Sequence, residues 1–483
     1  MIIEGETMSH YHGMQDLSGL PEHCRVDYQP SREDRFGWMF PHLAHSYVSP
    51  TVLQNIGKAG GPMDNGGASD RTSSVAVGMV IFGQFIDHDI TLDTSSSFAS
   101  VNHPNEIPNV RTPTLDLDSI YGNGPEAQPY LYNQTPPFRN AKLLTGADEA
   151  GADDRRKNDL LRVPTGSAII GDPRNDENRI ISQMQLGFIK FHNAICDKLR
   201  AEAAADGHDL KNDELFEEAH REVIWHYQWV VVNDFLVSMC GQAVVDDVLS
   251  QGRRFYKCSV PFIPIEFAVA AYRFGHSMVP MKIQVQKGDT AFEFFGQILG
   301  RGFSPVGDTR AVVDWHELFF TAENRVVQRA EKLDTLMAGD LLELPFVPDG
   351  GEKSLATRNL LRGNSFRLPG GDTIAREMGR TDAEVGAVMA RINSISNGEV
   401  TSGAPLWLYI LAEAEVVGRE SSTGNFEPGE GLGPVGARIV AEVLIGLLEL
   451  DPESYLGSNR NWMPSSGYDT VGKILSSVNS DLL

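Results

Sequence analysis

The chain has 483 residues, enough to bury a large core, and its composition of 41% hydrophobic and 22% charged residues is typical of a soluble globular protein. Its 65 acidic and 41 basic residues give a formal net charge of -24, which repels nucleic acid backbones and anionic membranes. The four cysteines show no CxxC spacing. This argues against a zinc site, a redox dithiol or a disulfide scaffold, and it predicts reduced thiols.

The N-terminal stretch MIIEGETMSHYHGMQDL lacks the basic and apolar regions of a signal peptide. No run of eighteen apolar residues occurs in the chain, so we expect no integral membrane segment. The default expectation is a cytoplasmic protein, with signal-independent secretion left open. The oligomeric state is not predicted.

Helical periodicity dominates the long apolar segments, and strand-like alternation is short, as in KIQVQ at 282–286. The predicted helices cover residues 75–85, 177–205, 213–241, 264–279 and 435–450. Glycine-rich and charged loops separate these segments, but none is long enough to divide independent domains. We therefore predict a mainly α-helical fold with very little β structure.

A single large helical domain is predicted over residues 1–483, with its functional site buried in the helical core. Residues 1–70 would wrap that core as an N-terminal segment. Residues 71–370 would form the core itself, and residues 371–483 would add C-terminal helices.

The first unusual motif is GQFIDHDIT, which places polar side chains in an apolar helix. Gln84, Asp87 and His88 stand at i, i+3 and i+4 and therefore share one helix face. Asp89 points roughly 100° away and could bind a cation. A pocket lined by the first three residues and an ordinary buried histidine are both open readings. Binding of one metal by all three consecutive D-H-D residues is geometrically poor.

The next motif, TPTLDLDSIYG, carries oxygen-bearing residues at every second position. Thr112, Thr114, Asp116 and Asp118 could present several hard oxygen ligands on one face of an extended loop. Calcium fits this set, with Asp89 as a further ligand. A solvated turn is the alternative.

Three later segments are ambiguous when each is read alone. Arg174 and Glu177 could belong to an ordinary charged helix start. His276 lies in an apolar segment three residues after Arg273, and could be a core histidine or the axial ligand of a haem iron. Asn359 and Arg362 share one helix face and could support a site or lie on the surface.

In this order, GQFIDHD, TPTLDLDS, GDPRNDE, YRFGH and NLLRG resemble the motifs of the animal-type haem peroxidase family, also called the peroxidase-cyclooxygenase superfamily. The resemblance runs from about residue 84 to residue 369. It implies haem b and calcium as cofactors. The lack of a signal peptide and of disulfides makes the chain similar to bacterial members.

The resemblance also implies a role for each matching residue. His88 would be the distal histidine, with Gln84 as its neighbouring amide and Arg174 as the distal arginine. Asp87 and Glu177 would form ester bonds to the haem. His276 would be the iron ligand and donate its N–H to Asn359, and Arg362 and Arg273 would contact the haem. The calcium ligands would be Asp89, Thr112, Thr114 (through its backbone), Asp116 and Asp118.

The chain departs from the family pattern at two informative positions. Asn178 stands where some members carry a methionine that bonds to haem, so this third link cannot form. The dioxygenase branch has a radical-forming tyrosine three residues before the proximal histidine, and Arg273 occupies that position here. Tyr272 is one step away, about 100° around an α-helix.

The resemblance implies an enzyme that reduces hydrogen peroxide while oxidising phenols, iodide, bromide or thiocyanate. Three alternatives stay open. They are a fatty-acid dioxygenase of the same superfamily, a non-haem metalloenzyme that uses His88 with Asp87 or Asp89, and a non-catalytic calcium-binding scaffold.

Overall fold

The computed structural model describes residues 36–93, 95–97, 100–320 and 326–479. Cys24 and the first half of the predicted N-terminal segment lie outside these residues. The division into segments 1–70, 71–370 and 371–483 stays a prediction.

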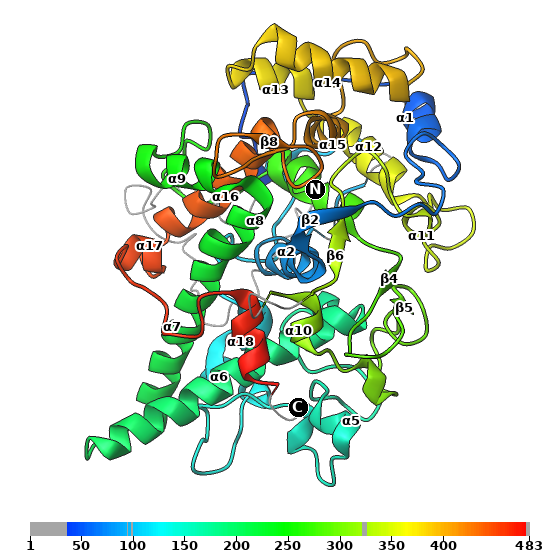
Figure 1. Cartoon of the computed structure of the whole chain (residues 1–483). Coiled ribbons are helices and arrows are strands. Elements are labelled where there is room, and N and C mark those ends of the chain that lie inside the picture. The colour runs from blue at the N-terminus through cyan, green and yellow to red at the C-terminus, as the bar shows by residue number, and fades with distance from the viewer. Residues whose placement is uncertain (1–35, 94, 98–99, 321–325, 480–483) are drawn as a thin grey trace, which may run out of the picture.

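The described chain is mainly helical, as predicted (Figure 1). Its longer α-helices are α1 (Pro50–Gly57), α2 (Val77–Ile90), α6 (Arg179–Ala205), α7 (Asn212–Val230), α9 (Gln242–Gln251), α12 (Leu355–Ser365), α13 (Gly371–Glu377), α14 (Asp382–Ile395), α15 (Leu406–Val416), α16 (Pro434–Leu450) and α18 (Val471–Ser477). The short ones are α3 (Asp118–Tyr121), α4 (Gly124–Ala127), α5 (Asp154–Lys157), α8 (Val237–Cys240), α10 (Trp315–Leu318), α11 (Gly339–Leu342) and α17 (Tyr455–Ser458).

The strands are short and pair in twos. β1 (Phe36–Gly37) pairs in parallel with β3 (Ile263–Pro264), and the antiparallel pairs are β2 (Arg71–Ala76) with β6 (Arg329–Glu331), β4 (Lys282–Ile283) with β5 (Phe292–Glu293), and β7 (Arg419–Glu420) with β8 (Phe426–Glu427). These pairings join distant parts of the chain, as β2 and β6 show beside α2 in Figure 1.

Helix α2 lies at the centre of the molecule and packs against α6 (Figure 1). Its apolar residues surround the helix on all sides, which is typical of a fully buried helix. Phe85 stacks on Phe188 of α6 with ring centroids 5.2 Å apart, and Tyr227 of α7 meets both rings edge-on. This aromatic cluster holds α2 in a defined position within the core.

Two predicted helices begin or wind differently in the structure. Residues 71–76 form β2, so the helix expected from residue 75 begins at Val77. The segment expected as a helix at 264–279 consists of a π-helical turn, η9 (Glu266–Ala270), and a 3-10 segment, η10 (Ala271–Met278). Ala270 breaks the regular winding with φ -129° and ψ -70°. Such irregular helices are frequent at functional sites.

The helix predicted at 177–205 is α6, and its start is capped by Asn178. The Asn178 side-chain oxygen accepts a hydrogen bond from the Ile181 N–H at 3.0 Å. The prediction at 213–241 also holds in outline, since α7 continues through a π-helical turn, η8 (Val231–Leu236), into α8.

Among the helices of the described ranges, none is long and apolar enough to cross a membrane. Cys196, Cys240 and Cys258 are free thiols, and no disulfide joins any of the described residues.

Candidate active site

A cavity of about 650 Å³ opens beside α2, η10 and α12. Eight of the predicted site residues line its wall: Gln84, Asp87, His88, Glu177, Arg273, His276, Asn359 and Arg362. They come from four segments that are far apart in the chain, so the fold brings the predicted site residues together.

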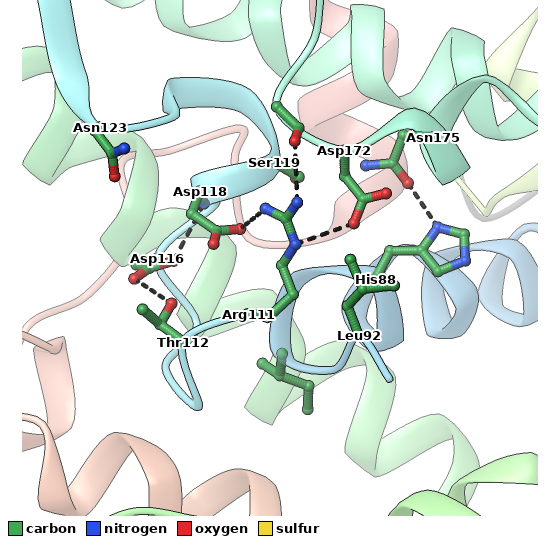
Figure 2. Close-up of polar contacts among 12 residues, drawn as sticks. His88, Leu92, Arg111, Thr112, Asp116, Asp118, Ser119, Asn123, Asp172 and Asn175 are labelled. Atoms are coloured by element: carbon green, nitrogen blue, oxygen red, sulfur yellow. Dashed lines mark hydrogen bonds and ion pairs between the residues drawn. The ribbon is translucent and has the colours of Figure 1, made fainter. Parts of the chain in front are cut away.

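His88 reaches the cavity from the C-terminal half of α2. Its side chain is buried, and its Nδ1 lies 2.8 Å from the side-chain oxygen of Asn175 (Figure 2). Burial, followed by the positive charge of Arg174, lowers the pKa of His88 to about 4. The imidazole is therefore neutral at neutral pH and can accept a proton.

Two carboxylates and an amide lie near His88 in the cavity wall. Gln84 donates its side-chain N–H to Glu177. Burial raises the pKa of Glu177 to about 7, so this carboxyl is close to half protonated at neutral pH. Asp87 accepts a hydrogen bond from the Thr91 hydroxyl at 3.0 Å.

Arg174 lies outside the wall of the cavity that the described residues form. Its guanidinium pairs with Asp172 at 2.7 Å, and Nη2 donates to the carbonyls of His88 at 3.0 Å and Thr91 at 2.6 Å. Arg174 therefore stabilises the C-terminal end of α2 and places a positive charge close to His88. The structure does not bring the Arg174 side chain into the cavity wall, where the predicted distal role would place it.

His276 enters the cavity from η10. Burial, then the charge of Arg273, lowers the pKa of His276 to about 3, which leaves a neutral imidazole with a free lone pair. The Asn359 amide nitrogen lies 2.9 Å from His276 Nδ1. We expected the reverse direction, with His276 donating to the amide oxygen. A half-turn of the Asn359 amide exchanges its nitrogen and oxygen and produces that direction.

Two arginines add positive charge to the cavity wall. Arg273 donates to the Ala268 carbonyl at 2.9 Å, and Arg362 donates to the Ser96 hydroxyl at 3.1 Å. Burial lowers the pKa of both groups, that of Arg362 to about 10. The Asp93 carboxylate oxygen Oδ2 lies 3.7 Å from Arg362 Nη1. An anionic group in the cavity would stabilise these partly buried charges.

A second cluster lies behind α2, where Asp89 meets Asp116 and Asp118 (Figure 2 shows the latter two). One oxygen from each of the three lies within 4.8 Å of the others. Asp89 is fully buried, and neither of its oxygens makes a hydrogen bond of normal geometry with any described residue. Thr112 and Thr114 both donate to Asp116 at 2.8 Å. This oxygen-rich set is chemically suited to a hard cation such as calcium.

Burial and mutual repulsion disfavour three negative charges in this cluster without a cation. Both effects raise the pKa of Asp89 well above its usual range. Burial, then the charge of Asp116, raises that of Asp118 to about 6. The intervening Leu117 has φ 56°, a left-handed backbone conformation that is strained for a leucine and common in functional loops.

Sequence reasoning missed the residues that connect the cluster to the cavity. Arg111 pairs with Asp118 at 2.9 Å and with Asp172 at 3.1 Å (Figure 2). Asp172 also pairs with Arg174 at 2.7 Å. Asn175 binds His88 directly. Asp172 and Asn175 lie inside the motif GDPRNDE, and Arg111 directly precedes TPTLDLD. Their positions within or beside these motifs could have indicated that they belong to the site.

A profile of the animal haem peroxidase family matches residues 93–370, more than half of the chain. The chain belongs to the animal haem peroxidase family. The matched residues include the oxygen-rich loop, GDPRNDE, η10 and α12, while His88 lies five residues before the match.

The curated relatives that this family member resembles are much longer proteins. A dual oxidase of Drosophila melanogaster is 26% identical over 302 residues, which cover 58% of this chain and 18% of the relative. The thyroid peroxidase of Canis lupus familiaris is 24% identical over 323 residues, covering 62% of this chain and 32% of the relative. The chain thus spans a third or less of these two relatives.

Solved structures share the fold over almost the whole chain. Peroxidase A from Dictyostelium discoideum aligns with a TM-score of 0.62 at 15% identity, covering 92% of this chain and 94% of that one. A fatty acid alpha-dioxygenase from Arabidopsis thaliana aligns with a TM-score of 0.55 at 15% identity, covering 91% and 75%. At this identity the likeness concerns the fold alone, and it is shared by a peroxidase and a dioxygenase.

The cavity fits the haem that family membership implies. His276 offers a neutral imidazole, whose lone pair can bind iron. Arg273 and Arg362 are partly buried cations that suit the carboxylates of a haem. The structure therefore contains an imidazole that could bind iron and two cations that could pair with the haem carboxylates.

Proposed function

We propose that this family member is a haem peroxidase that reduces hydrogen peroxide to water while oxidising small electron donors. The observation that carries this proposal is that two neutral histidines line one cavity, the buried His88 from α2 and the partly buried His276 from η10. Haem b would be held by His276 through Nε2. When bound, haem supplies the iron and the redox chemistry for O–O cleavage.

The residues of the chain would move the protons. His88 accepts a proton from hydrogen peroxide and returns it to the departing oxygen as the O–O bond breaks. Two electrons from the donor and two protons complete the reduction to two waters. Arg174 contributes its fixed charge from behind His88, and Gln84 orders the neighbouring polar wall through Glu177.

Asp87 and Glu177 are proposed to form ester bonds with haem methyl groups. Each ester replaces one methyl C–H by a C–O bond, a two-electron oxidation for which one hydrogen peroxide is the oxidant and two waters are the products. Both carboxyls line the cavity. Haem that stays with the chain after denaturation in the wild type, and leaves it in an Asp87→Ala/Glu177→Ala variant, would support these bonds. Release from both would contradict them.

The cavity wall includes aromatic rings that suit aromatic donors. Phe294 meets Phe295 edge-on with centroids 5.1 Å apart, and Phe295 meets Phe346 at 5.9 Å. Phe346 is 68% exposed, so this aromatic wall reaches the surface. Phenols would stack on these rings. Iodide, bromide and thiocyanate are included in the proposal as smaller donors.

The decisive test is an absorption spectrum of the purified, haem-supplemented protein before and after one equivalent of hydrogen peroxide. We expect a Soret band that shifts with peroxide in the wild type and is lost or strongly altered in His276→Ala. The matched control is His42→Ala, because the His42 side chain is 58% exposed and pairs with Glu377 at the surface. This control should behave as the wild type does.

The alternative functions predict different results in this experiment, in metal analysis and in thermal unfolding. A non-haem metalloenzyme would contain zinc or manganese and show no Soret band. A non-catalytic scaffold would melt at a calcium-dependent temperature but show no peroxide chemistry. A haem-loaded protein that oxidises none of the proposed donors with peroxide would refute the proposed activity.

One observation favours a fatty-acid dioxygenase as a second candidate. Tyr272 lines the cavity although its position differs from that of the tyrosine in the dioxygenase branch. Its hydroxyl is buried without a hydrogen-bond partner among the described residues, and its ring stacks on Phe267 at 4.6 Å. Oxygen uptake with an unsaturated fatty acid that is abolished in Tyr272→Phe would establish this candidate. Absence of uptake in the wild type would exclude it.

A further inference from the structure

A row of buried amide hydrogen bonds runs from the start of α3 to His88. Gln185 donates through Nε2 to the Ser119 carbonyl at 2.9 Å, and Asn175 donates through Nδ2 to the Gln185 side-chain oxygen at 2.8 Å. The Asn175 oxygen then lies 2.8 Å from His88 Nδ1. Ser119, Gln185 and Asn175 are all fully buried, so water does not replace these partners.

The Ser119 carbonyl, at the end of the row farthest from His88, determines the direction of every hydrogen bond in it. The Ser119 carbonyl can only accept, and it also accepts the Gly171 N–H at 2.9 Å. Gln185 must therefore turn its NH₂ group toward Ser119 and its oxygen toward Asn175. Asn175 must then donate to Gln185, which leaves its own oxygen facing His88. Reversing either amide would bring two buried oxygens together, which is unfavourable.

We propose that Asn175 and Gln185 are positioning residues that hold His88 in a single tautomer. An oxygen at Nδ1 requires the His88 proton to be on Nδ1, so the lone pair is on Nε2. Asn175 occupies Nδ1, and Nε2 is then the ring nitrogen available to the cavity that His88 lines. The inference rests on the proposed function, in which this lone pair accepts a proton from peroxide.

Without the row, a neutral imidazole could carry its proton on either nitrogen, and only one of these forms is a base toward the cavity. Asn175 alone does not decide between them, because a rotated amide would present NH₂ to His88 and select the wrong form. Gln185 removes that choice although it does not line the cavity. The proposal thus predicts an effect on His88 from Gln185, which contacts Asn175 and acts on the histidine through it.

The test is the rate at which cyanide binds to the ferric, haem-loaded protein, followed by the shift of the Soret band. Hydrogen cyanide, like peroxide, must give up a proton as it binds, yet no turnover occurs. Rates are compared on the alkaline plateau of their pH dependence, where the histidine is neutral in every variant. A His88→Leu variant measures how much of the rate depends on the distal base.

The informative pair is Gln185→Met and the double variant Gln185→Met/Asn175→Asp. Methionine has nearly the volume of glutamine but cannot orient Asn175, so we expect cyanide binding to slow about threefold to tenfold. A carboxylate at 175 can only accept, and with Gln185 removed it meets no opposing oxygen. The double variant should therefore recover the wild-type rate within about twofold, although it contains fewer native hydrogen bonds and melts at a lower temperature.

Each result has one meaning. Recovery of the rate without recovery of the melting temperature supports the proposal, because a purely structural role would make the rate follow stability. A double variant as slow as Gln185→Met, or a Gln185→Met variant as fast as the wild type, overturns it. If His88→Leu binds cyanide as fast as the wild type, the proposed role of His88 fails, and the positioning role fails with it.

Discussion

Calcium binding by Asp89, Asp116 and Asp118 can be predicted in magnitude as well as in direction. Burial raises the pKa of Asp118 to about 6 from 3.8, so keeping this group charged in the metal-free cluster costs roughly 3 kcal/mol. A divalent cation would relieve most of this cost. A free calcium concentration 100 times the dissociation constant would likewise stabilise the folded protein by about 2.7 kcal/mol. We therefore expect excess calcium to raise the melting temperature by roughly 5 °C.

The pH dependence follows from the sign of the same shift. Because the folded pKa is raised, the metal-free protein loses stability as pH rises from about 4 through about 6, where Asp118 becomes charged. Calcium should therefore stabilise the protein most above pH 6. Near pH 4 protons compete with the metal, so its effect should be small.

The assay is thermal unfolding in excess calcium chloride or in chelator, at several pH values. Asp89→Asn removes the fully buried charge and should make the metal-free protein more stable while abolishing the calcium response. Asp154→Asn is the matched control, since the Asp154 side chain is 85% exposed and far from the cluster in sequence. An equal calcium response in Asp89→Asn and the wild type, or no response above pH 6, would refute the reasoning.

Three further outcomes are expected. Burial raises the pKa of Asp234 to about 7 from 3.8, so the wild type loses stability as pH rises toward 7. Chemical denaturation should show that Asp234→Asn is more stable than the wild type above pH 7 by roughly 2–4 kcal/mol, and equally stable near pH 4. Asn359→Asp would pair His276 with a carboxylate and lower the haem reduction potential measured by redox titration, and an unchanged potential would argue against contact with the iron ligand. Phe85→Ala removes a fully buried ring and should lower the free energy of unfolding in urea by about 3–5 kcal/mol. A loss below about 1 kcal/mol would contradict the stacking of Phe85 on Phe188.

The sequence was sufficient to predict a helical fold, because long amphipathic or apolar segments such as α6 and α16 are visible as local patterns. It was less informative for α15, whose residues are buried on nearly all sides and therefore show little polar-apolar period. Periodicity also did not separate an α-helix from the π and 3-10 windings of η9 and η10. Their winding changes at Ala270, where the backbone leaves the helical region.

The residues that line the cavity were largely predictable, since each motif carries its own chemistry within one helical turn. Gln84, Asp87 and His88 share a face of α2 whatever the rest of the chain does. The contacts of Arg174 were not predictable, because they depend on Asp172 and on backbone carbonyls of another segment. A sequence motif contains no information about which acceptors will compete for a guanidinium.

The sequence by itself determined the chemical types of the site and their local grouping, because side chains three and four residues apart must share a helix face. The sequence suggested Asp89 as a partner of Asp116 and Asp118, and the tertiary structure brings the three together. Only the tertiary structure decided that Asn175 meets His88. These contacts join segments separated by tens of residues. Their geometry depends on how the helices pack, which local periodicity does not specify.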